Sequence, residues 1–586
     1  MYYGLAVSEA EVLNAEGTEC AKRGDLEEAL ALYERALLLD PTLAKAENNR
    51  GNILRRLDRV EEATRAFERA RELGSEKAVL NLASLLAQTG RLSEIDVLVS
   101  TLRPDEAADE VNLWAAVART TTWFIRDAAE MRRRVAAGEA DTCDERTFAG
   151  GLRVALPKTQ TITHHVLAER EDWFEDEIRF VRKLLQPGDI ALDVGANFGV
   201  FTLSMARAVG PGGKIVAVEP AWATRTFLEE SLRRNSLSNV TVMPYALSNE
   251  AGSATFFNAS SPELSGLAGA DVQDGTREVV ALRTLEEVAT QLNLPSLSFM
   301  KLDAEGEEVR ILEGAQRFLD AHEPLLMTEL VHGTTVNRGL LERLVALKME
   351  LFCLAPGPML LQPLTEERVR AGFLLNVFAC RPSRRDQLAS RGLLGRRAGT
   401  LTPDAATRQA ARAHVAALEP HGTAQGMLRE AAEHFALSAV SSDAGLILEG
   451  LEQALSLSVT ASAGGRASLG TLLFLARVAA ALGQRSISVS VALRALAHLD
   501  TGDAPVGTDI VVGPSPRFDR SPVGASLEAW VRASLLDHLL HEKAYSSMFD
   551  PSLVELAHKA LEGPYEQPLA SRIIKLFPEP HVTSHR

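Results

Sequence analysis

The sequence predicts an α/β fold, built on a mostly parallel, seven-stranded sheet with a helical region before it and another after it. Three observations predict this fold. Apolar segments of strand length alternate with helical patterns between about residues 190 and 380. A helical unit recurs after 34 residues near the N-terminus, and the last third of the chain is rich in alanine and leucine at helical spacing.

Size and composition exclude several classes of protein. A chain of 586 residues is too long for one hydrophobic core. Its net charge of −16 argues against nonspecific binding to nucleic acid or to an anionic membrane, because both need a basic face. The longest apolar run, 469–482, is too short for a membrane span. No secretory signal is evident, and the four cysteines lack CxxC spacing, so we expect a cytoplasmic protein without a zinc site.

The first hundred residues carry the repeated helical unit. Small residues, Ala29 and Ala36, allow two helices to approach closely, and Tyr33 fills the seam between them. The same pattern returns 34 residues later, with Phe67 in place of the tyrosine. These units resemble tetratricopeptide repeats. The resemblance implies a helical solenoid over residues 1–104 that recruits a protein partner or positions an acceptor.

The remaining domains are divided by composition. We expect a helical connector over 105–160, the sheet domain over 161–382, a linker rich in arginine and glycine over 383–403, and a C-terminal helical domain over 404–586. The seven strands are expected near 190–195, 214–219, 240–245, 298–303, 324–330, 350–355 and 373–380. A segment rich in glycine and serine, 258–275, is expected to form a loop or hairpin over the site.

The first strand of the sheet domain ends in Asp193, and a turn containing Gly195, Asn197 and Gly199 follows it. This order places a carboxylate and backbone N–H groups at the carboxyl end of a strand, where open α/β sheets bind ligands. Nicotinamide cofactors favour G-x-G-x-x-G, which this spacing does not give. Asp193 suits an ammonium or a hydroxyl group better than a phosphate, and its alternative role is the N-cap of the next helix.

The next strand also ends in an acid, Glu219. A carboxylate at this place suits the paired hydroxyls of a ribose. One ligand with an amino acid at one end and a nucleoside at the other would satisfy both Asp193 and Glu219. S-adenosylmethionine is such a ligand, and we expect it to be the cofactor.

Four segments then occur in a characteristic order, namely Asp193–Gly199, Val218–Pro220, Ala246–Ser248 and Lys301–Gly306. Together they resemble the FkbM-type S-adenosylmethionine-dependent methyltransferases. The resemblance covers about residues 165–382. It implies a Rossmann-like class I methyltransferase fold and O-methylation, often of a glycan or secondary-metabolite hydroxyl.

The resemblance also implies the roles of individual residues. Asp193 and Gly195 would face the methionine end of the cofactor, Asn197 would bond its carboxylate and Ser248 would lie near the adenine. The cofactor-binding residues implied are Asp193, Gly195, Asn197, Gly199, Glu219, Ser248 and Asp303.

The fourth strand supplies a candidate base. Lys301, Asp303 and Glu305 follow one another at two-residue spacing, so we expect them on one face of the strand. Asp303 could accept the proton of a substrate hydroxyl or orient the substrate. The alternative is a structural ion network that ties this strand to the following helix.

Glu329 and His332, at the end of the fifth strand, are further catalytic candidates beside Asp303. His332 could serve as a general base or be an ordinary loop histidine. With Asp303, the two could also form a divalent-metal site. No spacing rule supports that site, so we predict none.

The sequence therefore predicts a methyltransferase that moves a methyl group from S-adenosylmethionine to a hydroxyl of a glycan or small-molecule acceptor. The repeats would recruit that acceptor or a protein partner. The alternative is a non-catalytic interaction scaffold that still binds the cofactor.

Overall fold

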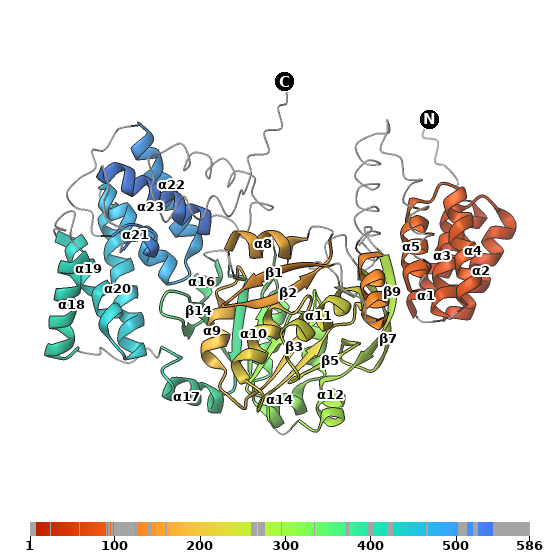
Figure 1. Cartoon of the computed structure of the whole chain (residues 1–586), viewed down its shortest axis with the longest axis horizontal. Coiled ribbons are helices and arrows are strands. Elements are labelled where there is room, and N and C mark those ends of the chain that lie inside the picture. Colours follow the sequence, from red (N-terminus) through yellow and green to blue (C-terminus); the bar gives the residue numbers. More distant parts are fainter. Residues whose placement is uncertain are drawn as a thin grey trace.

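The computed structural model describes residues 8–88, 126–258, 276–395, 403–418, 426–463, 467–501 and 526–542, interrupted by gaps of up to five residues, together with the stretches 266–267 and 512–519 and single positions between 91 and 124. Figure 1 shows the sheet domain between the N-terminal helices and the C-terminal helices.

The N-terminal helices pack as close antiparallel pairs. They are α1 (Glu9–Arg23), α2 (Leu26–Leu39), α3 (Ala44–Arg56), α4 (Val60–Glu72) and α5 (Glu76–Gln88). Tyr33 and Phe67 are buried, and each ring lies against a glycine of the facing helix. A Cβ on Gly51 would come within 2.6 Å of the Phe67 ring, so only glycine allows this helix spacing. The predicted seam between small residues and an aromatic ring is confirmed.

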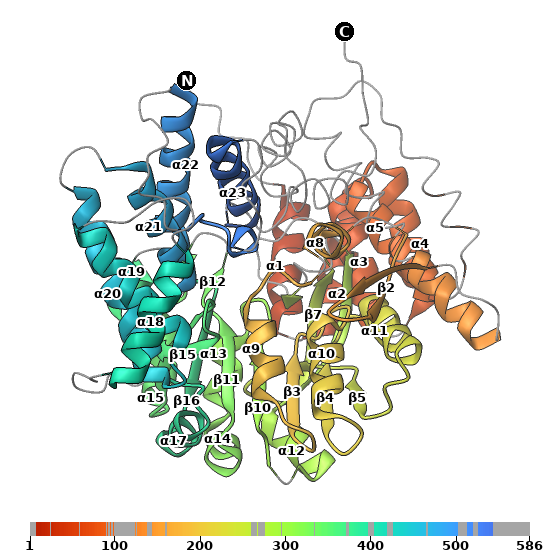
Figure 2. The same ribbon diagram turned by 60° about the vertical axis from the view of Figure 1, so that its left-hand side comes forward.

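The central sheet has eight strands in the described part of the chain, in the order β15-β14-β16-β11-β10-β3-β4-β5. They are β3 (Ile190–Val194), β4 (Lys214–Val218), β5 (Val240–Met243), β10 (Phe299–Leu302), β11 (Leu325–Glu329), β14 (Glu350–Ala355), β15 (Leu360–Pro363) and β16 (Asn376–Cys380). Strands β5, β4, β3, β10 and β11 run parallel, and β16 runs antiparallel to β11. Figure 2 shows these strands side by side.

All seven predicted strands are present, but the prediction of seven strands was wrong because the sheet has an eighth, β15. This edge strand pairs antiparallel with β14 through a turn that contains Gly357. The Pro-Gly-Pro sequence marks the turn, but it does not show that the chain returns as a strand of the same sheet. β15 also depends on a distant contact, because Gln362 donates a hydrogen bond to the carbonyl of Leu482 at 3.2 Å.

Helices cover both faces of the sheet, as a doubly wound fold requires. One face carries α9 (Glu177–Leu184), α10 (Val200–Val209) and α11 (Trp222–Arg234), and the other carries α12 (Leu285–Leu292), α13 (Glu308–Glu313), α14 (Gln316–His322) and α15 (Arg338–Ala346). Neighbouring residues of one strand belong to different cores: Phe299 joins the first core and Met300 joins the second. This alternation confirms strands that are buried on both faces.

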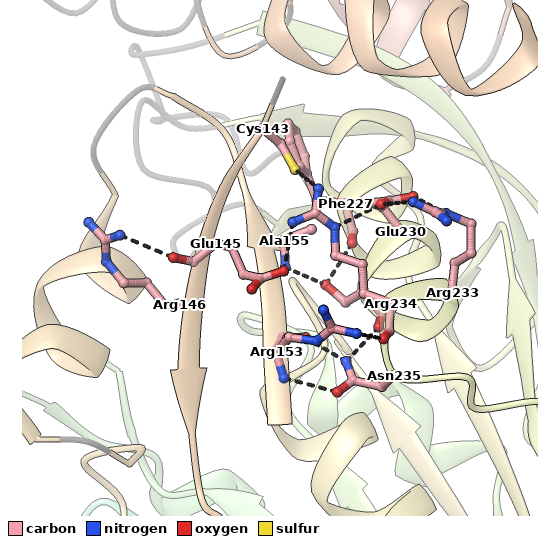
Figure 3. Close-up of polar contacts among 11 residues, drawn as sticks. Cys143, Glu145, Arg146, Arg153, Ala155, Phe227, Glu230, Arg233, Arg234 and Asn235 are labelled. Carbon is pink, nitrogen blue, oxygen red and sulfur yellow. Dashed lines mark hydrogen bonds and ion pairs between the residues drawn. The ribbon is translucent and has the colours of Figure 1, made fainter. Parts of the chain in front are cut away.

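A β-hairpin stands where a helical connector was predicted. Strands β1 (Asp144–Phe148) and β2 (Leu152–Leu156) pair antiparallel. Figure 3 shows how the end of α11 secures them, since Arg234 binds Glu145 of β1 and Glu230 of its own helix, both at 2.8 Å. The helical prediction was wrong for this stretch because the hairpin gains its stability from contacts with a distant helix. Residues 126–137, earlier in the connector, are helical.

The predicted linker is partly helical as well. Helix α17 (Pro382–Ser390) occupies its first third, with proline in the first turn, where a missing N–H costs nothing. Leu388 of this helix is buried, and Arg385 forms an ion pair with Glu350 of β14 at 2.6 Å. The abundance of arginine therefore reflects helix-to-sheet contacts in this stretch rather than a solvated linker.

A second, smaller sheet lies beside the repeats. It contains β6 (Ala246–Leu247), β7 (Gly252–Asn258), β8 (Gly266–Leu267) and β9 (Thr276–Arg283) in the order β6-β9-β7-β8 within the described residues. Helix α5 of the repeats contacts β9 (Figure 1). Most of the predicted insert, 258–275, lies outside the described residues.

The remaining elements are short connections and the C-terminal helices. They are α8 (Ile162–Arg170), β12 (Val331–His332), β13 (Thr335–Val336), α16 (Glu366–Arg370), α18 (Ala405–Leu418), α19 (Gly426–Val440), α20 (Ala444–Ala463), α21 (Leu469–Ala481), α22 (Arg485–Thr501) and α23 (Leu527–Glu542), with a 3-10 turn over Pro516–Phe518. Arg170 of α8 donates to the carbonyl of His541 in α23 at 2.9 Å. None of the described helices is long and apolar enough to cross a lipid bilayer.

Replacing Phe67 by alanine should lower the free energy of unfolding of the repeats by about 3–5 kcal/mol, because the ring fills a closed seam. Leu38→Ala is the matched control, since Leu38 is 81% exposed and its loss should cost less than about 0.5 kcal/mol. Urea unfolding followed by circular dichroism measures both. Equal effects of the two substitutions would contradict this packing.

Candidate active site at the carboxyl ends of the strands

Acidic side chains gather where the parallel strands of the central sheet end. Asp193 is the fourth residue of β3 and Glu219 follows β4, while Asp303 follows β10 and Glu329 ends β11. Because β3, β4, β10 and β11 are parallel neighbours, these residues share one edge of the sheet. That edge is where open α/β sheets place their ligands.

The turn after β3 brings two strand ends into contact. Gly195 has a φ of 75°, and a Cβ there would lie 1.8 Å from the carbonyl oxygen of Asp303. Its N–H and that of Ala196 both donate to the carbonyl of Val218, at 3.0 and 3.1 Å. Asn197 adopts the left-handed conformation with a φ of 50°, which asparagine tolerates better than most residues. The conformation of this turn is therefore set by the close approach of its backbone to the carbonyl of Asp303.

Asp193 is fully buried. Its Oδ2 accepts a hydrogen bond from Thr202 Oγ1 at 2.5 Å, and its Oδ1 has no hydrogen-bond partner among the described residues. Burial raises the pKa of Asp193, and Lys301 and Thr202 oppose that rise. A buried acceptor without a donor is costly, so this oxygen points to a donor supplied from outside the chain.

Glu219 is held by backbone donors from both turns. Its Oε2 accepts from the N–H of Asn197 at 2.8 Å, and its Oε1 accepts from the N–H of Ala221 at 2.9 Å. Burial raises the pKa of Glu219 to about 7, although both backbone bonds lower it. Sequence reasoning missed the bond to Asn197, since nothing in the spacing shows that the first turn holds the second acid.

Lys301 is the buried cation of this edge. Its Nζ lies 2.6 Å from Asp303 Oδ2, and it donates more weakly to the carbonyl of Gly195 at 3.5 Å. Burial lowers the pKa of Lys301. The negative charges of Asp303, Asp193 and Glu175 raise it by more, so the net shift is upward. In β3 and β10, Asp193 and Lys301 are directly paired. The lysine is therefore charged and shared by carboxylates of two strands.

Three carboxylates form a cluster next to this lysine. Oxygens of Asp303, Glu305 and Glu329 lie within 4.8 Å of one another. Burial and the negative charge of Asp303 together raise the pKa of Glu305 to about 8 and that of Glu329 to about 9. Oxygens this close could surround a cation, but carboxylates packed in this way also share protons, and we assign no metal to them.

The expectation that strand alternation places Glu305 was wrong. Strand β10 ends at Leu302, and Glu305 occupies a left-handed turn with a φ of 49°. The turn still brings Glu305 to the cluster. A spacing of two residues fits both a continuing strand and such a turn, so the sequence alone could not distinguish the two.

Other predicted residues lie nearby or outside the described structure. Ser248 is buried after β6, with its hydroxyl 3.3 Å from Glu307 Oε2. The backbone of His332 belongs to β12, but its side chain lies outside the described residues, so its role stays a prediction. Gly199 has a φ of 91° and begins α10 as its N-cap.

One residue of the edge was not predicted. Glu175 precedes α9, and it accepts hydrogen bonds from Trp173 Nε1 and Asn376 Nδ2, both at 2.7 Å. It lies close enough to Lys301 and Asp303 for their charges to shift its pKa. No sequence signal could place it here, because it comes from a connection and not from a strand end.

Comparison with known proteins identifies two parts of the chain. Residues 193–343 match the model of the methyltransferase FkbM domain, and residues 17–73 match that of the TPR repeat. Both resemblances found in the sequence are therefore confirmed.

Two relatives match parts of the chain. It is 28% identical over 234 residues to the AMB antimetabolite synthetase AmbE of Pseudomonas aeruginosa, covering 32% of this chain and only 11% of that protein. It is 28% identical over 192 residues to the 31-O-demethyl-FK506 methyltransferase FkbM of Streptomyces tacrolimicus, covering 28% of this chain and 72% of that protein. A solved SAM-dependent O-methyltransferase from Thermotoga maritima is 17% identical, with a TM-score of 0.21, over 42% of this chain and 80% of that one.

The FkbM methyltransferase domain identifies the cofactor as S-adenosylmethionine. The residues present fit it. The unpartnered, buried Oδ1 of Asp193 suits an ammonium group, and the fixed carboxylate of Glu219 suits a pair of ribose hydroxyls. These two acids were the ones that the sequence selected.

Gly195→Ala should disrupt the junction of β3 and β10, since its Cβ would overlap a backbone oxygen that cannot move aside. We expect loss of cofactor binding and a destabilisation of more than about 3 kcal/mol. Gly188→Ala is the control: its φ is 92°, but nothing lies within 4 Å, so only backbone strain of about 1–2 kcal/mol applies. Urea unfolding and calorimetry compare them, and equal losses would contradict the close approach.

Glu219→Ala should weaken cofactor binding by about 1–3 kcal/mol, through the loss of charge-assisted hydrogen bonds. Titration calorimetry with S-adenosylmethionine measures this change. Glu342→Ala, on the exposed side of α15, is the control. Unchanged affinity in the Glu219 variant would remove this residue from the site.

Proposed function

We propose that this chain, which carries a methyltransferase FkbM domain over residues 193–343, transfers a methyl group from S-adenosylmethionine to an acceptor hydroxyl. The observation that carries the proposal is the carboxylate cluster of Asp303, Glu305 and Glu329 beside the cofactor-binding acids. It offers a base where an acceptor would meet the cofactor.

The chemistry asks little of the protein beyond alignment and proton transfer. When bound, the cofactor supplies a methyl group that its sulfonium already activates. The pKa of Glu329, about 9, and that of Glu305, about 8, lie much nearer to physiological pH than those of ordinary glutamates. A carboxylate with such a pKa is a stronger base than an ordinary one, so its ionised form takes up a hydroxyl proton more readily.

Within this proposal, each residue has a stated task. Asp193, Gly195, Asn197, Gly199, Glu219 and Ser248 bind the cofactor. Asp303 lies between the two halves of the site, since its carboxylate holds Lys301 and its carbonyl touches Gly195. Glu329 accepts the proton, and His332 stays the alternative base.

A glycan or small-molecule hydroxyl is the acceptor that the proposal favours. Support comes from the name of one relative, a 31-O-demethyl-FK506 methyltransferase, and from the acidic character of the cluster. Carboxyl groups accept hydrogen bonds, and their protonated forms also donate them, so the cluster suits an acceptor rich in hydroxyl groups. The repeats would deliver this acceptor, or a protein that carries it, to the sheet that α5 contacts.

The direct test is incubation of the full chain with methyl-labelled S-adenosylmethionine and an extract of its source organism. Label recovered as a methyl ether supports the proposal, whereas a methyl ester would identify a carboxylate acceptor and overturn it. Label on nitrogen or carbon overturns O-methylation, while cofactor binding without label would make the chain an interaction scaffold.

Glu329→Gln should lower kcat/KM for methyl transfer by roughly 10²–10⁴-fold, because the base is lost while its shape is kept. Affinity for S-adenosylmethionine should stay within about twofold of the wild type, since Glu329 belongs to the acceptor side. Glu342→Gln should leave both quantities unchanged. A wild-type rate in the Glu329 variant would eliminate it as the base.

A further inference from the structure

We propose that Glu175 is a positioning residue for methyl transfer, which holds Lys301 and the Asp303–Glu305–Glu329 cluster in their working arrangement. It precedes the matched domain and belongs to the connection between α8 and α9. The proposal rests on the proposed function for its role in turnover. Its structural basis lies in two hydrogen bonds and one strand register.

Both carboxylate oxygens of Glu175 are fixed by neutral donors. Oε1 accepts from the indole N–H of Trp173 and Oε2 accepts from the side-chain amide of Asn376, each at 2.7 Å. Neutral donors orient a carboxylate without cancelling its charge. In its ionised form, Glu175 is therefore a negative charge in a fixed position.

The register of β11 and β16 places Glu175 near Glu329, the proposed base. Asn376 of β16 is buried and lies directly opposite Glu329 of β11. The amide that holds Glu175 thus stands beside Glu329 at the same edge of the sheet. A side chain from outside the sheet is in this way tied to the strand end that carries the base.

The charges that face Glu329 come from three elements of the described structure. Asp303 and Glu305 come from the turn after β10, Lys301 from β10 itself, and Glu175 from the α8–α9 connection. The neighbour from β16, Asn376, is neutral. Burial is the main cause of the raised pKa of Glu329, and the three carboxylates raise it further while Lys301 lowers it.

The hydrogen bonds to Glu175 favour its ionised form, since both of its oxygens accept. Burial raises the pKa of Glu175 and the charge of Asp303 adds to that rise, while Lys301 and the bonds from Trp173 and Asn376 oppose it. The positive charge of Lys301 therefore interacts with three acids, Asp193, Asp303 and Glu175. Without the charge of Glu175, Lys301 would interact more strongly with the carboxylate cluster. Glu329 would also lose one repulsive negative neighbour.

The test is the pH profile of kcat/KM for the full chain carrying Glu175→Gln. The limb on which activity rises with pH should move to lower pH by roughly one unit, because Glu329 then loses its proton more easily. Glu175→Asp keeps the charge and should hold the limb near its wild-type position. Asp176→Asn removes a neighbouring acid that pairs with Arg179 outside the cluster, and it should not move the limb.

A uniform loss of activity in the Glu175→Gln variant, without any shift of the limb, would overturn the proposal and leave Glu175 a purely structural residue. A second readout needs no turnover. Infrared titration of the carboxylic acid band should show the same downward shift in the variant. If the wild type transfers no methyl group but this band shifts, the proposed function fails and the placement of Glu175 stands; an unshifted band overturns the placement.

Discussion

The ion pair between Lys301 and Asp303 is the interaction on which the rest of the site depends. A buried ammonium is stable only with carboxylates close by, and this one has Asp303 at 2.6 Å and Asp193 on the adjoining strand. At the same place the ends of β3 and β10 approach so closely that only glycine fits at position 195. The turn that follows, and hence the start of α10, is fixed by the same constraint.

The second acid of the cofactor site is tied to the same turn. Glu219 ends the neighbouring strand, yet one of its two backbone donors is the N–H of Asn197. The two strand ends are thus coupled, because a shift of the turn that contains Asn197 would displace the carboxylate of Glu219. Such preorganisation lowers the cost of binding a ligand that must contact both.

The sequence predicted what depends on local pattern. Buried apolar runs predicted seven of the eight strands described in the central sheet. The acids at the ends of β3 and β4 predicted the cofactor, because the end residues of neighbouring parallel strands meet at one edge. It did not predict the β1–β2 hairpin or β15, since both depend on distant partners such as Arg234 and Leu482. Glu175 was missed for the same reason, because Asn376, 201 residues away, holds it in place.

We propose that this edge binds S-adenosylmethionine through the ionised carboxylate of Glu219, whose pKa is raised by burial. Calorimetric titration of the full chain with S-adenosylmethionine at about pH 6 and about pH 7.5 tests it most directly. The pKa of Glu219 is about 7, and hydroxyl donors need its ionised form, so affinity should fall by nearly tenfold at the lower pH. Equal affinity at the two pH values would contradict the account, as would undetectable binding at both with Asp193 and Glu219 intact.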